Sequence, residues 1–179
     1  MVPDTVTVEL RDAVSPYTLR ASKKVVLNSS GAGTINNFTT QLNNISPYYI
    51  VIKHRNAVET WSAGGNTFNS SGTLSYNFTT AASRAYGNNL VLKSGKYCIY
   101  SGDVNHDGIV DSGDLSAVDN DNSLYASGYL ATDANGDGIV DSGDLALVDN
   151  NNSLYIGKVI PTDAPGFAAF KSRFIKSNN

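Results

Sequence analysis

The sequence predicts a mainly β protein, with an immunoglobulin-like antiparallel β-sandwich over residues 1–100 and a small α module over residues 101–160. Two observations predict this fold class. The first hundred residues consist of short alternating or β-branched runs that are separated by turn residues. At residue 101 the composition changes abruptly to a segment rich in Asp, Asn and Gly that contains a duplicated unit.

The strand-like runs follow one another at the spacing typical of a sandwich. We expect strands over residues 5–10, 17–27, 33–38, 48–54, 57–61, 73–78, 89–92 and 96–100. Turn residues such as Ser15-Pro16, Ser30-Gly31 and Gly64-Gly65 lie between these runs. This number of short strands in about a hundred residues favours the sandwich, with a small barrel as the alternative.

Charge is distributed very unevenly along the chain. The formal net charge is -3, but residues 1–100 carry +5, residues 101–160 carry -10 and residues 161–179 carry +2. Ten uncompensated negative charges in one short segment repel one another unless cations neutralise them. The acidic segment therefore predicts bound metal. No apolar run approaches the roughly 20 residues of a membrane span, so we expect no membrane insertion.

An internal repeat carries the chemistry of the acidic segment. Residues 103–125 align without gaps with residues 133–155, and 18 of 23 positions are identical. Each copy contains D-x-N-x-D-G-x-x-D-x-x-D, a twelve-residue loop with oxygen-bearing side chains at positions 1, 3, 5, 9 and 12. Gly108 and Gly138 occupy position 6, where such a loop must turn sharply. Two complete copies are hard to explain as polar turns that bind nothing.

The donor set of each loop consists of oxygen atoms, which favours a hard cation. The expected ligands of the first site are Asp103, Asn105, Asp107, the backbone carbonyl of Ile109, Asp111 directly or through water, and Asp114. Those of the second site are Asp133, Asn135, Asp137, the carbonyl of Ile139, Asp141 and Asp144. Six to eight flexible oxygens suit Ca²⁺ better than Mg²⁺, and zinc would require Cys or His. We therefore expect two Ca²⁺ ions.

Apolar residues inside the repeat predict how its parts pack. Val110 and Val140 stand at position 8, as expected if the two loops pair back to back through a short β-bridge. Each loop is followed by a helical pattern, and one buried edge on each helix is expected from Leu115, Val118, Leu145 and Val148.

The loops differ from an ordinary EF-hand, because Asp114 and Asp144 replace its Glu at position 12 and no helical pattern precedes either loop. A loop followed by a single helix, duplicated over roughly residues 101–160, resembles the type I dockerin domain. The resemblance implies a small calcium-folded module that docks noncovalently onto cohesin domains of scaffold proteins. More weakly, the whole arrangement is similar to C-terminal modules of secreted proteins from Bacteroidota and Ignavibacteria-type bacteria, and to the Ig-like module that precedes some dockerins.

The sequence departs from the dockerin pattern on the recognition surface. Dockerins usually carry hydroxyl residues at loop positions 10 and 11 and a basic residue near position 18. Here those positions hold Ser112-Gly113 with Asn120, and Ser142-Gly143 with Asn150. The resemblance thus implies calcium binding, but it does not imply a known cohesin as partner.

We expect a noncatalytic, extracellular or cell-surface docking module. No nucleophile elbow, phosphate loop or zinc motif is present, so no enzymatic activity is expected. His54, Arg55 and Glu59 are assigned surface or structural roles. Nucleic acid is an unlikely ligand, because the basic residues are scattered and an acidic module is tethered beside them.

Two other functions stay open. The chain could be a self-assembling subunit of a calcium-stabilised surface filament or layer, with the basic sandwich of one copy against the acidic module of another. It could also be a carbohydrate-binding module of a secreted glycoside hydrolase, with Trp61, Tyr48 and Tyr49 as a sugar platform, although core packing is the more common role of such aromatics.

Three smaller expectations concern Cys98 and the chain ends. Cys98 is the only cysteine, and we expect it to be a small buried hydrophobe. In the tail over 161–179, Phe167, Phe170 and Phe174 have the spacing of an amphipathic helix. The N-terminus lacks a signal-peptide pattern, so we expect a mature chain or an excerpt of a longer one.

Overall fold

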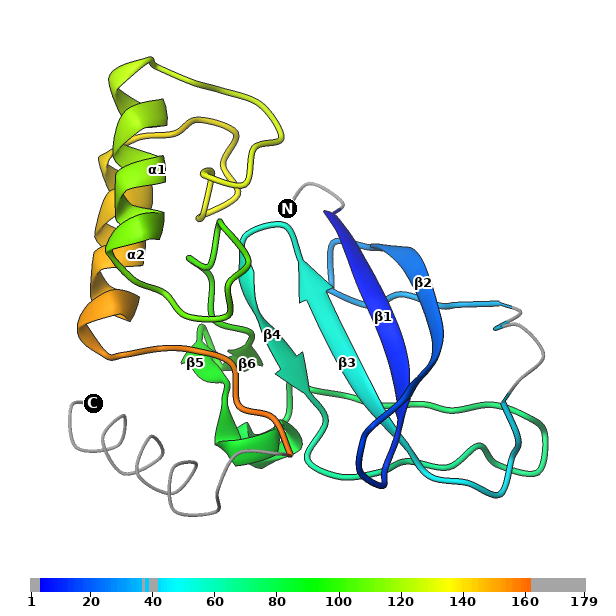
Figure 1. The fold of residues 1–179 in the computed structure, drawn as a ribbon. Helices are drawn as coiled ribbons and strands as arrows, with labels where there is room; N and C mark the ends of the chain where they lie inside the picture. The colour runs from blue at the N-terminus through cyan, green and yellow to red at the C-terminus, as the bar shows by residue number, and fades with distance from the viewer. Residues whose placement is uncertain (1–3, 37, 39–41, 162–179) are drawn as a thin grey trace.

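A computed structural model describes residues 4–36, 38 and 42–161 (Figure 1). The expected amphipathic helix of the C-terminal tail lies outside the described residues. The elements are β1 (Asp4–Asp12), β2 (Leu19–Leu27), β3 (Tyr48–His54), β4 (Ala57–Trp61), the 3₁₀ turns η1 (Ala82–Arg84) and η2 (Tyr86–Asn88), β5 (Val91–Lys93), β6 (Lys96–Cys98), α1 (Ser112–Ser123) and α2 (Ser142–Ser153). The chain is mainly β with two helices near its end, as the sequence predicts.

The main sheet has four antiparallel strands in the order β2-β1-β3-β4. In its middle, Leu10 of β1 lies opposite Ala21 of β2 and Ile50 of β3. These three side chains are buried together with Tyr48 on one face of the sheet. Because side chains alternate between the two faces of a strand, the opposite face carries Thr7 and Glu9 of β1, with Lys53 and the buried Val51 of β3 opposite them.

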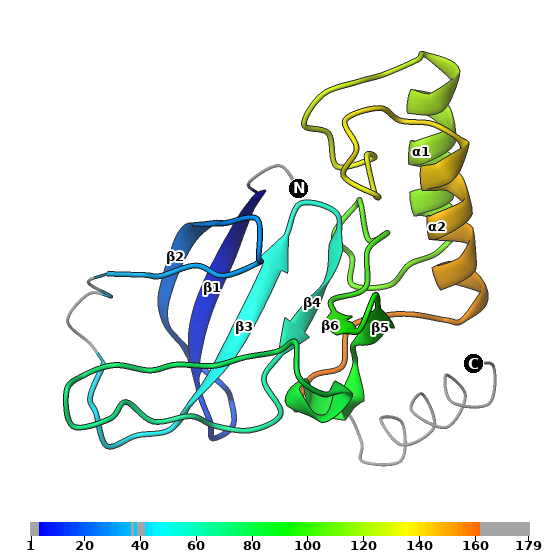
Figure 2. The same ribbon diagram turned by 180° about the vertical axis from the view of Figure 1, so that it is seen from behind.

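Irregular segments, rather than a second sheet, cover the apolar face of the main sheet in the part of the chain that is described. Figure 2 shows the segment between β4 and η1 crossing the sheet. Phe68, Leu74, Tyr76 and Phe78 from that segment pack against the buried cluster. Residues 73–78 form no strand, and neither do residues 33–36, so the predicted strands over 73–78 and 33–38 are wrong. Apolar and polar residues alternate in these segments because one side of each segment is buried. A segment without strand pairing can be buried on one side just as a strand can.

A two-stranded hairpin of β5 and β6 leads toward the helical module. Its turn is Ser94-Gly95, where both residues have positive φ. Cys98 at the end of β6 is exposed, so the expectation of a buried cysteine is wrong. In such a narrow hairpin Tyr97 points inward, and its neighbours therefore point to solvent.

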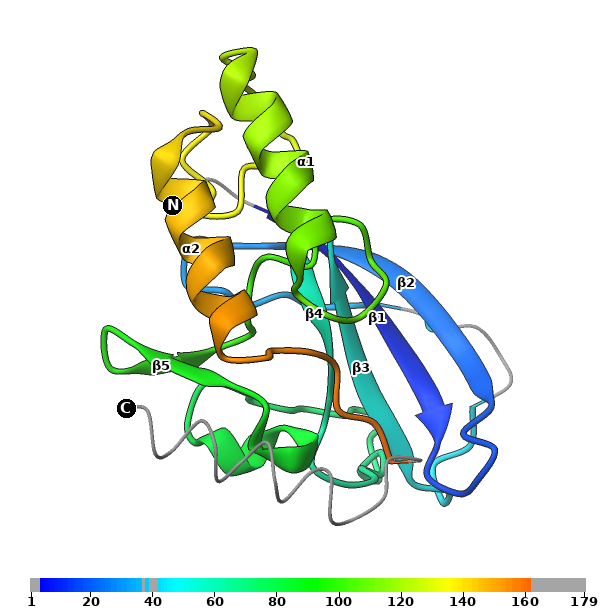
Figure 3. The same ribbon diagram turned by 60° about the vertical axis from the view of Figure 1, so that its left-hand side comes forward.

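The two helices lie side by side (Figure 3), and each begins at an aspartate of the preceding loop. Val118 and Val148 are fully buried between them, and Leu115 and Leu145 pack against the same cluster. The predicted buried edge of each helix is therefore confirmed.

The sheet and the helical module share one hydrophobic core. The cluster that holds Val118 and Val148 also contains Val58 of β4 and Tyr100. The backbone N–H of Val58 donates to the carbonyl of Tyr100 at 2.9 Å. Side-chain packing is therefore continuous across residue 101, where the composition of the sequence changes.

Candidate metal centre

The two loops lie between the helix pair and the sheet (Figure 1). Position 9 of each loop is the N-cap of the following helix, and position 12 completes a capping box. Asp111 Oδ1 accepts from the N–H of Gly113 at 2.7 Å, and Asp114 Oδ2 accepts from the N–H of Asp111 at 2.9 Å. Asp141 and Asp144 repeat this arrangement. Closing the loop and starting the helix are therefore coupled.

Hydrogen bonds turn the other predicted side chains into the first loop. Asn105 Oδ1 accepts from the N–H of Asp107 at 2.8 Å, and Asp107 Oδ1 accepts from the N–H of Ile109 at 2.9 Å. Asp114 Oδ1 accepts from the N–H of Val104 at 2.8 Å. Positions 3, 5 and 12 are thus folded over the loop backbone.

The second loop has the same internal bonds. Asn135 Oδ1 accepts from the N–H of Asp137 at 2.8 Å, and Asp137 Oδ1 accepts from the N–H of Ile139 at 3.0 Å. Asp144 Oδ1 accepts from the N–H of Asn135 at 2.9 Å. The identical spacing of the repeat has therefore produced equivalent local geometry.

The loops are braced reciprocally. The N–H of Val110 in the first loop donates to the carbonyl of Ile156 after α2 at 2.8 Å. The N–H of Val140 in the second loop donates to the carbonyl of Ala126 after α1 at 2.9 Å. The predicted bridge between the two loops is therefore wrong, because each loop pairs with the segment that follows the helix of the other. Neither half of the repeat is complete alone.

One oxygen in the first loop stands out. Asp103 is only 2% exposed, and its Oδ1 is buried without a hydrogen-bond partner. Burial raises the pKa of Asp103, and the negative charges of Asp114 and Asp107 raise it further. A hydrogen bond from the backbone of Gly108 lowers the pKa but does not cancel these effects. A buried carboxylate oxygen with no partner is costly. A cation at this position would remove that cost.

The donor chemistry fits Ca²⁺, but the carboxylates are not gathered. Among the described residues, no group of three or more His, Cys, Asp or Glu side chains is placed to hold a metal ion. In each expected set of six ligands, two are of another kind, the Asn amide oxygen and the Ile backbone carbonyl.

The first ligand of the second loop has a different environment. Asp133 Oδ1 accepts from the N–H groups of Gly136 at 2.9 Å and Asp137 at 3.1 Å, and Oδ2 accepts from that of Gly138 at 3.1 Å. A guanidinium nitrogen of Arg55 lies 3.6 Å from the same Oδ2. Both carboxylate oxygens of Asp133 therefore have partners.

The turn between β3 and β4 reaches into the second loop. Asn56 Nδ2 donates to the carbonyl of Asp133 at 2.6 Å, and Arg55 donates to the same carbonyl at 3.1 Å and to that of Leu130. The guanidinium of Arg55 also lies over the ring of Tyr129. We expected a surface or structural role for Arg55, and it joins the sheet to the module. No sequence pattern pointed to this contact or to Asn56.

Asp4 and His54 extend this contact to the first strand. The Tyr129 hydroxyl donates to Asp4 Oδ1, and His54 Nε2 lies 2.8 Å from Asp4 Oδ2. Burial acts to raise the pKa of Asp4, but the hydrogen bonds from Tyr129 and Thr5 and the nearby His54 outweigh it and lower the pKa. We call Asp4, His54, Arg55, Asn56, Tyr129 and Asp133 the junction clasp.

Two of the three aromatic residues considered as a sugar platform lie in the interior, and Tyr49 is half-buried. Tyr48 is 2% and Trp61 is 5% exposed, which agrees with their interpretation as core residues. Tyr49 makes edge contacts with the rings of Trp61, Tyr17 and Tyr86. Glu59, the third residue of the charged trio, accepts a hydrogen bond from the indole of Trp61 and has a structural role.

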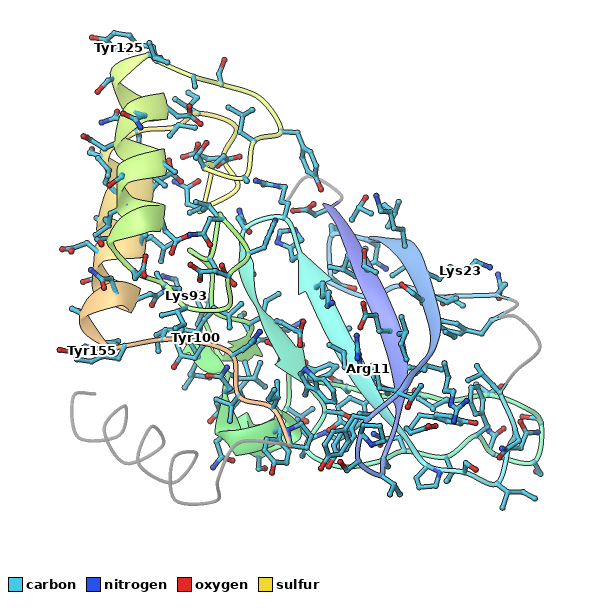
Figure 4. The ribbon with its side chains drawn as sticks, viewed as in Figure 1. Arg11, Lys23, Lys93, Tyr100, Tyr125 and Tyr155 are labelled. Atoms are coloured by element: carbon cyan, nitrogen blue, oxygen red, sulfur yellow. The ribbon has the colours of Figure 1, made fainter. Side chains whose placement is uncertain are left out.

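The glycines at position 11, where dockerins usually carry a hydroxyl residue, lie close to the N-cap carboxylates. A Cβ atom on Gly113 would lie 3.1 Å from Asp111 Oδ1, and one on Gly143 would lie 3.0 Å from Asp141 Oδ1. A side chain at either position would require the N-cap carboxylate to shift by a few tenths of an ångström. Tyr125 and Tyr155, by contrast, project from the ends of the helices (Figure 4) and are 89% and 71% exposed.

Comparison with known proteins identifies one region. The family model of the dockerin type I domain matches residues 101–153, which include both loops and both helices. No curated protein and no solved structure matches the chain. In the described part of the chain, no helix is long and apolar enough to cross a membrane. The loop and helix repeat of this chain is therefore dockerin-like.

Proposed function

We propose that the chain is a noncatalytic, extracellular calcium-binding module whose residues 101–160 fold around two Ca²⁺ ions and dock onto a protein partner. The dockerin type I match supports this function. The observation that carries the proposal is the buried Asp103 Oδ1, which has no partner in a duplicated loop of oxygen donors. The twelve ligands expected from the sequence are the residues proposed to hold the two ions.

The proposed role of the ions is to make a highly acidic segment fold. Bound Ca²⁺ supplies positive charge that offsets the repulsion between carboxylates. Asp111 and Asp141 cap the helices, while Asp114 and Asp144 bond to both the loop and the cap. Ordering a loop therefore orders the first turn of its helix, so binding free energy becomes folding free energy.

The proposed docking surface lies on the outer faces of α1 and α2. Its exposed residues occupy equivalent positions, namely Ser112, Ser116, Asp119, Asn120 and Ser123 on α1, and Ser142, Ala146, Asp149, Asn150 and Ser153 on α2. These residues offer hydroxyl, amide and carboxylate groups and no positive charge. We infer that the partner is a cohesin-like surface that contributes basic residues or other hydrogen-bond donors.

Residues 1–100 are proposed to act as a spacer that holds the docking module in a fixed orientation. The shared core around Val58 and Tyr100 and the junction clasp support this role. Such contacts restrict the motion that a free linker would allow.

Calcium titration by calorimetry after treatment with chelator tests the calcium part of the proposal. We expect two sites, each binding at roughly 10⁻⁴ M or tighter, with a gain in helical circular dichroism. A double variant Asp119→Asn/Asp149→Asn, altered on the exposed helix faces, should keep both sites. Failure to bind calcium, or an unchanged spectrum, would contradict the proposal.

Binding to a panel of purified cohesin domains tests the docking part. We expect calcium-dependent binding to at least one domain, and at least tenfold weaker binding for Asp119→Lys/Asp149→Lys. The control is Lys93→Glu/Lys96→Glu on the β5–β6 hairpin, which changes the net charge by the same amount in the opposite sense. Binding that survives chelation, or that the control lowers equally, would count against docking through the helices.

Self-assembly is a second candidate, which the +5 and -10 charges of the two parts support. In that case the partner is another copy of the chain. Light scattering at low salt in calcium should then show assemblies that dissociate in EGTA. A chain that stays monomeric at high concentration would exclude this alternative.

A further inference from the structure

A cavity of about 640 Å³ lies between the polar face of the main sheet and the first loop. We call it the junction groove. Its volume lies in the range of roughly 300–1,000 Å³ found for small-molecule sites. On its sheet side, Thr7 of β1 stands between Lys24 of β2 and Lys53 of β3, so these side chains share one face. Residues of the first loop and Lys158 form the opposite side.

Nitrogen-bearing side chains outnumber carboxylates in this groove. Those that line it are Lys24, Lys53, His54, Arg55, His106 and Lys158, against Glu59 and Asp103. Lys53 pairs with both Glu9 at 3.0 Å and Glu59 at 3.3 Å. Arg55 and His54 are already engaged in the junction clasp.

Two cations in the groove lack such partners. Within the described ranges, neither Lys24 nor Lys158 forms a side-chain ion pair. The stem of Lys158 lies across Gly108, where a Cβ atom would be 2.7 Å from its Cδ. Glycine at this loop position therefore leaves the room that Lys158 occupies beside the groove.

We propose that the junction groove binds a small polyanion with at least two sulfate, phosphate or carboxylate groups. One group meets Lys24 on the sheet, and another meets Lys158 and His106 beside the first loop. Hydrogen bonds between charged partners are stronger than neutral ones, and a partly enclosed groove strengthens the attraction. The hydroxyls of Thr5, Thr7 and Tyr129, which also line the groove, supply further polar contacts.

Calcium should strengthen this binding, a step that rests on the proposed function. Asp103 lines the groove and is also the first expected ligand of the first loop. Without metal its negative charge opposes an anion. A cation in the loop offsets that charge, and by linkage the anion must then raise the calcium affinity of the first loop by the same factor.

Calorimetry with three probes tests the groove and distinguishes sources of the anion. The probes are pyrophosphate, digalacturonate and a sulfated disaccharide, each titrated into the full chain in calcium and in EGTA. We expect at least one probe to bind in calcium with a Kd below about 1 mM. The probe that binds most tightly identifies the anionic group preferred. If none binds, the proposal is wrong.

A variant pair tests the location. Lys24→Glu/Lys158→Gln should weaken probe binding at least tenfold while both calcium sites persist. The matched control, Lys93→Glu/Lys96→Gln, changes the same charge outside the groove and should bind as wild type does. Equal weakening in both variants would mean nonspecific attraction and overturn the site. Equal probe binding in calcium and in EGTA would support the anion site but overturn its coupling to calcium binding. A chain that binds the probe but no calcium would refute the proposed function and leave the anion site standing.

Discussion

The two loops share every expected ligand but have different neighbours. Asp103 leaves one buried oxygen without a partner, whereas both oxygens of Asp133 are engaged by backbone N–H groups or Arg55. The first loop borders the junction groove, and the second loop is held by the junction clasp. The two loops thus share the hydrogen bonds of positions 3 and 5 but not the electrostatic environment of position 1.

This difference predicts that the calcium affinities of the two loops depend on different parts of the chain. The first loop has a buried carboxylate oxygen without a hydrogen-bond partner, so a cation should offset a larger energetic cost there. The second loop already has hydrogen bonds from Arg55 and Asn56. Its calcium affinity should therefore depend on the sheet, and that of the first loop should not.

Replacement of the first ligand should give the largest effect. Asp103→Ala and Asp133→Ala should each remove one of the two calcium sites, because position 1 contributes a carboxylate to each. In calcium, Asp133→Ala should destabilise the fold more than Asp103→Ala does, by roughly 2 kcal/mol, because it also removes an acceptor of three N–H groups. Calorimetry and urea unfolding measure both effects. Two intact sites in either variant would refute the ligand assignment.

Loss of the clasp should be the next largest effect. Arg55→Ala should lower the free energy of unfolding by roughly 2 kcal/mol and weaken calcium binding at the second loop only. Amide NMR signals of Gly108 and Gly138 report the two loops separately. Arg20→Ala, which removes an exposed partner of Asp12, is the control and should leave both loops unchanged. Equal weakening of the two loops would show that the clasp does not distinguish them.

The position-6 glycines offer a smaller, matched comparison. Gly108 and Gly138 have φ of +96° and +93°, so alanine at either position costs about 1–2 kcal/mol of backbone strain. Only at Gly108 would the new Cβ meet Lys158. We expect Gly108→Ala to be the more destabilising in thermal unfolding. Adding Lys158→Ala should remove the excess, and an excess that persists would mean that another contact causes it.

Asp4→Asn should give the smallest effect, with a defined pH dependence. The pKa of Asp4 is lowered in the folded chain from 3.8, so its hydrogen bonds stabilise the fold above that value and are lost as the pH falls through the folded pKa. At pH 7 we expect a loss of about 1 kcal/mol. Unfolding of the variant and wild type should converge in acid, and a constant difference at all pH values would contradict this role.

The strands were predicted unequally well. The bounds of β3 and β4 coincide with the predicted runs, because these strands pair in the sheet and bury side chains on both faces. The run over 73–78 has a similar pattern but packs on the sheet without pairing. Periodicity reports which side of a segment is buried, and it does not report whether the backbone finds a partner.

The sequence by itself determined the features that depend on near neighbours. The duplicated loops, their turned-in side chains and the helix starts follow from spacings of two to ten residues, over which the local backbone geometry fixes the contact. Only the tertiary structure decided the reciprocal bracing, the isolated oxygen of Asp103 and the clasp. Asn56 and Asp133 are 77 residues apart, and no local pattern can encode a contact that the packing of two units against one core creates.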